Sequence, residues 1–341
     1  MMDKLFLRGG LTGKEFMKKF DCNFERMVSV ENLLDAWQEF VRGKRAKPDV
    51  QEFSLRLMDN ILQLHHELVN RTYRHGGYQS FNISDPKPRN IHKANVRDRL
   101  LHHAVHRILY PLFDRTFIAD SYSCRLSKGT HKAINRFRAF AYKASRNHTR
   151  TCWVLQCDVK KFFASVDHRV SLDILKRYIS DTDIIRLLRE VVGSFHSGIP
   201  GKGLPLGNLT SQLLANVYMN ELDQFVKHKL KIRHYIRYAD DFTILSENKT
   251  LLESLTPQID GFLRQNLKLE LHPDKICMKT IASGVDFLGW VHFLGHRVLR
   301  TATRRRMLKQ IAEHPAPETL ISYAGLLRHG NAYKLLASLG F

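Results

Sequence analysis

The sequence lacks the features that would place a protein in a membrane or in an oxidising compartment. No hydrophobic run approaches the length of a membrane span, and the opening residues Met1-Met2-Asp3-Lys4 lack the basic-then-apolar order of a signal peptide. The 5 cysteines are odd in number and show no paired Cys-x-x-Cys spacing, which argues against a disulfide framework and against a zinc site. We therefore expect a folded cytoplasmic protein with no membrane partner.

Acidic residues are also scarce beside the basic ones. The chain carries 54 Lys and Arg residues against 33 Asp and Glu residues, a formal net charge of +21. Such an excess is typical of proteins that displace counterions from a phosphate backbone. The basic residues are spread through the chain instead of forming a tail, which favours a long nucleic-acid channel over a disordered arm. A basic protein with no polyanionic partner is the alternative.

Hydrophobic spacing and turn residues predict an α+β fold with no internal repeat. No linker divides the chain cleanly, so we expect subdomains that share a core. The predicted helices cover about residues 29–41 (with Ser29 as N-cap), 53–68, 96–113, 210–229 and 251–266, another begins near Asp167, and short helices follow residue 301. The predicted extended segments are 78–83, 153–159, 267–271 and a strand pair around 287–290, with a loop at 198–207.

The most informative stretch is Tyr238-Ala239-Asp240-Asp241-Phe242, which we place at the tip of a β-hairpin. Two adjacent aspartates on a tight turn repel each other unless a strong positive charge lies between them. A divalent cation is the usual partner, because carboxylate oxygens are its preferred ligands. A solvated Asp-Asp turn between edge strands is the alternative.

A third carboxylate, Asp158, ends the predicted buried strand 153–159. With Asp240 and Asp241 it can converge on two Mg²⁺ ions (Mn²⁺ being the alternative ion), and the backbone carbonyl of Val159 could supply a further oxygen ligand. One ion would activate an attacking 3′-hydroxyl, and the other would hold a triphosphate and the leaving pyrophosphate. Taken alone, Asp158 would be interpreted as a strand-end cap or the partner of an ion pair.

The order of several motifs resembles the fingers–palm–thumb core of reverse transcriptases, over roughly residues 30 to 335. The matching blocks are Lys87-Pro88-Arg89, Val96-Arg97-Asp98-Arg99, Asp158-Val159-Lys160-Lys161-Phe162-Phe163, Gly207-Asn208-Leu209-Thr210-Ser211-Gln212, Tyr238-Ala239-Asp240-Asp241 and Phe287-Leu288-Gly289-Trp290. Several ordered motifs are far more specific than any one of them.

Within that family, the chain is most similar to the bacterial and phage enzymes of diversity-generating retroelements. Most reverse transcriptases have a glutamine before the glycine of the fourth block and a Ser-Pro at its end. Here Leu206 precedes Gly207, and Ser211-Gln212 ends the block, as in the diversity-generating group. The ending Ser322-Tyr323-Ala324-Gly325-Leu326-Leu327-Arg328-His329 also looks like the thumb of that group.

The resemblance implies a right-hand polymerase with an antiparallel palm sheet and helical N-terminal and thumb regions. The expected regions are an N-terminal helical extension at 1–75, fingers at 76–150, a palm at 151–295 (with a finger segment at about 168–205) and a short helical thumb at 296–341.

The resemblance also implies roles for residues around the three aspartates. Phe163 matches the aromatic steric gate that selects dNTPs, while its neighbour Phe162 faces the core, although the two could exchange roles. Lys275 matches a lysine that can protonate pyrophosphate, with an exposed loop lysine as the alternative. The predicted dNTP-binding residues are Lys87, Arg89, Arg97, Phe163, Leu206, Gly207 and Gln212.

Two further groups of residues match nucleic-acid contacts. Phe287, Leu288, Gly289 and Trp290 resemble the primer grip, or else form a plain strand turn with a buried tryptophan. Arg300, Arg304, Arg305 and Arg306 would contact the nucleic-acid backbone, unless they form the basic face of a helix. After Lys275 the only acidic residues are Asp286, Glu313 and Glu318, too few for a ribonuclease H site.

The expected function is RNA-directed DNA synthesis that copies a template RNA into error-prone, adenine-mutagenic cDNA. The expected partners are template RNA, the cDNA or primer, dNTPs and a small basic accessory protein with a helical-bundle fold. A reverse transcriptase of an antiphage defence system or of a retron is the first alternative. A catalytically inactive RNA-binding scaffold is the second.

Overall fold

The computed structural model describes residues 19–84 and 88–340. The chain divides into two compact units, each made of two chain segments. The first contains residues up to Arg115 together with Val166–Leu214, and the second contains Thr116–Ser165 together with the chain from Ala215 onward. This division does not coincide with the predicted regions 1–75, 76–150, 151–295 and 296–341, which stay a prediction.

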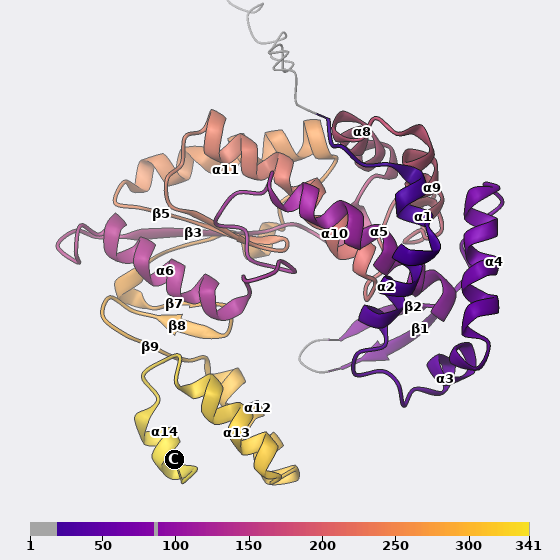
Figure 1. Ribbon diagram of the computed structural model, residues 1–341. Helices are drawn as coiled ribbons and strands as arrows, with labels where there is room; N and C mark the ends of the chain where they lie inside the picture. The colour runs from indigo at the N-terminus through magenta and orange to yellow at the C-terminus, as the bar shows by residue number, and fades with distance from the viewer. Residues whose placement is uncertain (1–18, 85–87, 341) are drawn as a thin grey trace, which may run out of the picture. The chain divides into compact units, whose positions relative to one another are not determined.

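The first unit consists mainly of helices with one β-hairpin (Figure 1). Its helices are α1 (Phe24–Val28), α2 (Val30–Phe40), α3 (Pro48–Leu55), α4 (Leu57–Val69), α5 (Val96–Asp114), α8 (His168–Tyr178), α9 (Thr182–Gly193) and the start of α10 (Leu209–Gln224). The hairpin pairs β1 (Tyr78–Ile83) with β2 (Arg89–Ala94). As predicted, Ser29 caps α2 by accepting a hydrogen bond from the backbone N–H of Asn32.

The predicted helix over 53–68 is helical except at Arg56, where a break divides it into two helices. Arg56 leaves the helical conformation (φ −125°, ψ 44°) and separates α3 from α4. The helix α3 begins at Pro48, whose fixed φ suits the first helical position. The side-chain amide of Asn60 donates to the carbonyl of Phe53, which replaces a bond that the break removes. No Gly or Pro marks the break, so the sequence gives no local signal for it.

The second unit contains a four-stranded antiparallel sheet. Its order is β4 (Tyr235–Tyr238), β5 (Asp241–Ser246), β3 (Trp153–Asp158) and β6 (Cys277–Thr280). The helix α6 (Thr130–Ala144) packs on one face, where Phe137 and Phe140 share a core with Val154. Figure 1 shows α11 (Lys249–Leu267) on the other side of the sheet. Cys152 and Cys157 are buried beside and within β3, whereas Cys124 is exposed.

A smaller sheet and three helices complete the second unit. The sheet contains β7 (Val285–Phe287), β8 (Trp290–His292) and β9 (Arg297–Leu299). The helices α12 (Thr301–Glu313), α13 (Pro317–Leu327) and α14 (Tyr333–Ser338) follow. Gly330 lies so close to Trp290 that a Cβ there would be 1.9 Å from a ring carbon, so only glycine fits. The tryptophan thereby joins the sheet to the helical tail.

Helices and antiparallel sheets together confirm the predicted α+β class. Other expectations were approximate: the helix predicted over 210–229 is α10 followed by a π-helical turn, η1 (Phe225–Lys229), and the predicted extended segment 267–271 contributes only a bridge between Leu271 and Val159. Among the described residues, no helix is both long and apolar enough to cross a membrane.

Candidate active site

The predicted hairpin at Tyr238–Phe242 is confirmed. The strands β4 and β5 pair so that Tyr238 faces Asp241, which leaves Ala239 and Asp240 as the turn. Ala239 adopts a left-handed backbone conformation (φ 57°), which a non-glycine residue rarely does. A tight turn of this kind projects Asp240 and Asp241 from the end of the sheet.

The register of the sheet brings the third carboxylate to the same place. Asp158 is the last residue of β3, and it is the direct cross-strand partner of Asp241 on β5. Like charges that face each other on neighbouring strands repel. The fold therefore gathers Asp158, Asp240 and Asp241 at one end of the sheet, as the sequence predicted, and concentrates negative charge there.

The ionisation of Asp241 reflects this crowding. Although part of its side chain reaches solvent, packing around the carboxyl group withdraws it from water and raises its pKa to about 7. A hydrogen bond with Asp158 and the negative charges of Asp240 and Asp158 raise this pKa further. A carboxyl group that titrates near neutrality, among other carboxylates, marks a candidate functional site.

Lys275 supplies a positive charge to this group of carboxylates. Its Nζ lies 2.8 Å from Oδ2 of Asp158, and this hydrogen bond is the main cause of its raised pKa. The backbone fixes the contact, because the N–H of His272 donates to the carbonyl of Asp158 at 2.8 Å. The N–H of Lys275 in turn donates to the carbonyl of His272. The structure thus places the predicted proton donor beside the predicted metal ligands.

The donor set has the chemistry of a Mg²⁺ site, but its side chains do not form a closed ligand shell. Among residues 19–84 and 88–340, no three His, Cys, Asp or Glu side chains are already arranged around a metal position. The clustered oxygen donors and the raised pKa of Asp241 nonetheless fit a divalent cation, which favours oxygen ligands and removes the repulsion. The predicted contribution of the Val159 carbonyl stays a prediction.

Phe163 lies on the short helix α7 (Phe162–Ser165), close after Asp158 in the chain. Phe162 is buried, as predicted, whereas Phe163 is only partly buried. The two rings are 5.3 Å apart and nearly perpendicular. This difference in exposure favours Phe163 over Phe162 as the residue that contacts a nucleotide.

The predicted dNTP contacts other than Phe163 belong to the first unit. Lys87 lies outside the described residues, and Arg89 begins β2 with an exposed side chain. The Leu206–Gly207 loop lies on β2: the carbonyl of Leu206 accepts a hydrogen bond from the N–H of His92 at 2.9 Å. A Cβ on Gly207 (φ 105°) would lie 2.8 Å from Ile91, so a glycine is needed there.

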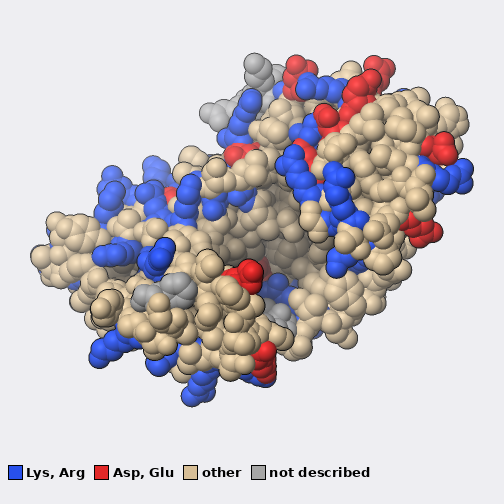
Figure 2. Space-filling view, turned by 60° about the horizontal axis from the view of Figure 1, so that its bottom comes forward, with Lys and Arg blue, Asp and Glu red and all other residues tan. Residues whose placement is uncertain are grey.

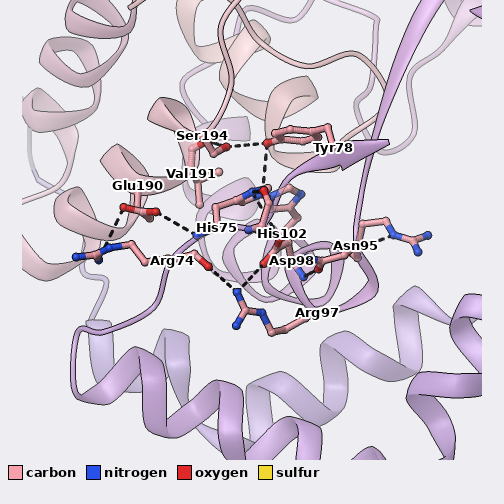
Figure 3. A network of polar contacts seen from close by, with 12 residues as sticks. Arg74, His75, Tyr78, Asn95, Arg97, Asp98, His102, Glu190, Val191 and Ser194 are labelled. Atoms are coloured by element: carbon pink, nitrogen blue, oxygen red, sulfur yellow. Dashed lines mark hydrogen bonds and ion pairs between the residues drawn. The ribbon is translucent and has the colours of Figure 1, made fainter. Parts of the chain in front are cut away.

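Two other members of this set have polar partners within the first unit. The N–H of Gln212 donates to the carbonyl of Asn208 at the start of α10. Figure 3 shows the guanidinium of Arg97 directed toward the carbonyl of Arg74 and the buried Asp98. Arg97 also forms an ion pair with Glu67 at 2.7 Å. These contacts favour a structural role for Arg97 over the predicted contact with a triphosphate.

The predicted primer grip is a tight turn between β7 and β8. Leu288 and Gly289 both have positive φ (51° and 86°), the conformation of the favoured two-residue hairpin turns. Phe287 and Trp290 flank the turn and are buried, so these aromatic rings support the core. Leu288 and Gly289 are partly exposed, and Leu288 also packs against this core, so the primer grip stays a prediction.

The arginines predicted to contact phosphates lie at the start of α12. Arg304 and Arg305 are exposed, Arg306 is half-buried, and Arg300 pairs with Asp286 at 3.1 Å. Basic side chains are distributed widely over the face drawn in Figure 2, and acidic ones are fewer. Such a surface suits a polyanionic partner.

Sequence reasoning missed a group of residues directly behind the aspartate turn. Arg237 is buried, forms an ion pair with Asp223 and donates to the carbonyl of Ala239. Two signals could have revealed this group. Arg237 interrupts the apolar strand residues of β4, and Asn216, Asn220 and Asp223 recur at the spacing of one helix face on α10.

Comparison with known proteins gives a consistent result. Residues 83–292 match the family described as reverse transcriptase (RNA-dependent DNA polymerase). Protein YkfC of Escherichia coli (strain K12) is 27% identical over 284 residues, which cover 72% of this chain and 72% of that protein. The group II intron-encoded protein LtrA of Lactococcus lactis subsp. cremoris is 23% identical over 278 residues, covering 61% of this chain and 44% of LtrA.

A third relative covers less of both sequences. The putative COX1/OXI3 intron 1 protein of Saccharomyces cerevisiae is 27% identical over 180 residues, which cover 50% of this chain and 20% of that protein. The chain therefore spans most of YkfC but less than half of each of these two intron proteins.

Proposed function

The chain belongs to the reverse transcriptase family and is an RNA-directed DNA polymerase; from this premise we propose that Asp158, Asp240 and Asp241 carry out two-metal-ion nucleotidyl transfer. The observation that carries this proposal is the cross-strand pairing of Asp158 with Asp241, beside Asp240 in the turn. When bound by these carboxylates, two Mg²⁺ ions supply positive charge that activates the primer 3′-hydroxyl and stabilises the leaving pyrophosphate.

The chain's own side chains have separate tasks in this reaction. Asp241 must be ionised to act as a ligand, so a proton leaves its carboxyl group when the site is assembled. Lys275, held beside Asp158, is charged and can donate a proton to the leaving pyrophosphate. Phe163 excludes a ribose 2′-hydroxyl, and Arg89 with Lys87 binds the triphosphate of the incoming dNTP.

Primer extension on a defined RNA template tests this assignment. We expect the purified chain to incorporate dNTPs in a Mg²⁺-dependent reaction and Asp158→Asn to lose that activity. Arg264→Gln is a matched control, because Arg264 forms an exposed ion pair on α11. Undiminished synthesis by Asp158→Asn would refute the assignment, whereas loss by both variants would indicate a general folding defect.

We further propose that the product is error-prone cDNA of the kind made by diversity-generating retroelements. The feature that supports this is Leu206, where most reverse transcriptases have a glutamine. Leu206 is partly exposed, and its backbone is held on β2, which supports contact with a nascent base pair instead of burial beneath Gly207. An apolar contact discriminates shapes by only about 1–3 kcal/mol, whereas unpaired polar groups reject wrong partners more strongly.

Sequencing of the cDNA tests this subtype. Substitutions opposite template adenines should dominate for the parent and fall in Leu206→Gln. Equal error rates in an active Leu206→Gln variant would remove Leu206 as the cause of the errors.

The chain's high net charge also supports a small basic accessory protein that selects the template, because the charge alone binds polyanions without sequence preference. Correct template choice by the isolated chain would contradict that requirement.

The relatives favour a second candidate, in which the chain copies a structured RNA of the group II intron type. Its similarity to LtrA supports this candidate. The antiphage-defence and retron alternatives use the same chemistry on other RNAs. Sequencing the RNA that copurifies with the chain distinguishes these candidate functions, because each predicts a different template. Only the diversity-generating function predicts adenine-directed substitutions in the cDNA.

A further inference from the structure

The buried group behind the aspartate turn suggests a role in holding the catalytic residues in place. Arg237 lies on β4, only 1% of its side chain is exposed, and its partner Asp223 on α10 is fully buried. The two side chains form a bidentate contact, Nε to Oδ1 at 2.8 Å and Nη2 to Oδ2 at 2.6 Å. Such paired bonds fix the plane of a guanidinium more firmly than a single ammonium bond could.

The remaining guanidinium nitrogen reaches the turn itself. Nη1 of Arg237 donates to the carbonyl of Ala239 at 2.9 Å and to Oδ1 of Asn216 at 3.3 Å. Ala239 immediately precedes Asp240, and its left-handed conformation is unfavourable for a residue with a Cβ. A conformation of this kind persists only when surrounding contacts hold it. Arg237 supplies such a contact at the carbonyl that orients Asp240.

Residues 120–123 of the same unit hold Arg237 and its partner Asn216 in position. The N–H of Arg237 donates to the carbonyl of Asp120, and its carbonyl accepts from the N–H of Tyr122, both at 3.0 Å. Asn216 is itself held, because its side-chain amide donates to the carbonyl of Ser123 at 2.9 Å. Every member lies in the second unit, so the network can be described as one body.

We propose that Arg237 is a positioning residue, which holds the turn at Ala239 so that Asp240 and Asp241 can bind metal together, and that Asp223 and Asn216 orient Arg237 for this task. The proposal rests on the proposed function of the aspartates. It goes beyond that function by assigning the geometry of the turn to a buried ion pair outside the set of proposed metal ligands.

A purely structural role is the competing explanation, and physical chemistry separates the two. A buried ion pair is often replaceable by apolar residues of similar size without loss of stability. An apolar replacement cannot, however, donate a hydrogen bond to the carbonyl of Ala239. A variant that folds as well as the parent but lacks this donor therefore isolates the positioning role.

The test compares four proteins: Arg237→Lys, the triple variant Tyr235→Phe/Asp223→Leu/Arg237→Met, the control Tyr235→Phe and the parent. Arg237→Lys keeps the charge but loses the guanidinium nitrogens that bind Asp223 and Ala239 at the same time. The triple variant removes the whole charged network, including the hydroxyl of Tyr235, which donates to Asp223 at 2.8 Å. The control loses only that hydroxyl and keeps the contact between Arg237 and Ala239.

The measurements are kcat, the KM for dNTP, the Mg²⁺ concentration for half-maximal rate and the binding of Mn²⁺ to the free protein by electron paramagnetic resonance. We expect Arg237→Lys and the triple variant to lose about tenfold to a hundredfold in kcat. Both should require more Mg²⁺ and bind Mn²⁺ more weakly, while the KM and RNA affinity change little. Tyr235→Phe should match the parent in all of these.

Adding Ala239→Gly to Arg237→Lys gives a second, independent readout. Glycine adopts the left-handed conformation without the penalty that alanine incurs, so part of the lost kcat should return. The proposal is overturned if a folded triple variant keeps the parent's kcat and Mn²⁺ affinity, or if Ala239→Gly returns none of the loss. Failure of the proposed function is separate: it would appear as full activity in Asp158→Asn, whatever the Arg237 variants do.

Discussion

Asp223 and the pair Asp158–Asp241 lie in the same unit, yet the protein surrounds them with different positive charges. Asp223 is fully buried and receives a bidentate guanidinium and a tyrosine hydroxyl. Asp158 and Asp241 face each other at the end of the sheet, where the half-exposed Lys275 donates its ammonium group to Asp158. Arginine forms a rigid, multiply bonded partner, whereas lysine is a mobile point charge that a ligand can displace.

Under the proposed function, the difference separates a carboxylate that stabilises the fold from carboxylates that bind a ligand. A buried charge that is fully paired contributes to a defined structure, and removing its partner is costly. Carboxylates left with excess negative charge are poised for an incoming cation, and the raised pKa of Asp241 is the sign of that excess. Substitutions at the two sites should therefore change different properties of the protein.

The largest expected effect is on activity at the sheet end. Asp240→Ala combined with Asp241→Ala should lower dNTP incorporation by roughly a thousandfold or more, because the site loses its charged ligands. RNA affinity should be nearly unchanged, since it depends on Lys and Arg contacts to phosphate. Primer extension and filter binding measure the two properties. Polymerisation well above trace level by the double variant would contradict the assignment of the sheet-end carboxylates to the reaction.

The next effect is on stability at the buried pair. Asp223→Ala leaves the guanidinium of Arg237 buried without its counterion, so we expect a loss of about 3–5 kcal/mol in the free energy of unfolding. Urea denaturation followed by circular dichroism measures this loss. A loss below about 1 kcal/mol would mean that Arg237 finds other acceptors and that Asp223 resembles the carboxylates at the sheet end.

A smaller effect is expected at the other ion pair. Lys275→Gln removes a contact to Asp158 whose lysine side chain is 47% exposed. Pairs of this exposure contribute at most about 1 kcal/mol, so the unfolding free energy should change by less than that. The same denaturation experiment measures it. A loss as large as that of Asp223→Ala would show that both carboxylate groups are structural.

A further effect concerns the pH dependence of metal-free stability. The pKa of Asp241 is raised to about 7 in the folded protein, so the fold disfavours its ionised form. The stability that this group contributes is complete below pH 4 or so, the range of an ordinary aspartate, and is lost as the pH rises through 7. Melting temperatures at pH 5 and pH 8 in EDTA should differ more for the parent than for Asp241→Asn.

Local sequence signals were sufficient to locate the three clustered aspartates. Asp240 and Asp241 sit on a turn between two short strands, and Asp158 ends a buried strand, so alternation and turn residues located all three. The break at Arg56 has no such signal, because it depends on how α3 and α4 pack. Arg97 matched a family motif, but its contacts with Glu67 and Asp98 are visible only in three dimensions.

The contacts of Arg237 also could not be predicted from local sequence signals. Its residues come from α10, β4 and the turn, and a side chain on a helix meets one on a strand only through tertiary packing. The polar stripe on α10 and the charged residue in β4 are each recorded in the sequence. The contact between them cannot be predicted from the sequence, because neither segment specifies how the helix and the strand pack together.

The buried thiols of the central strand make its opening measurable. Burial raises the pKa of Cys152 and of Cys157 to about 12, so neither thiol reacts with an alkylating reagent while the sheet is closed. Cys157 immediately precedes Asp158, and the exposed Cys124 provides a fast-reacting reference in the same unit. Mass spectrometry of iodoacetamide labelling can thus time the local opening of the strand that carries Asp158, without the introduction of any cysteine.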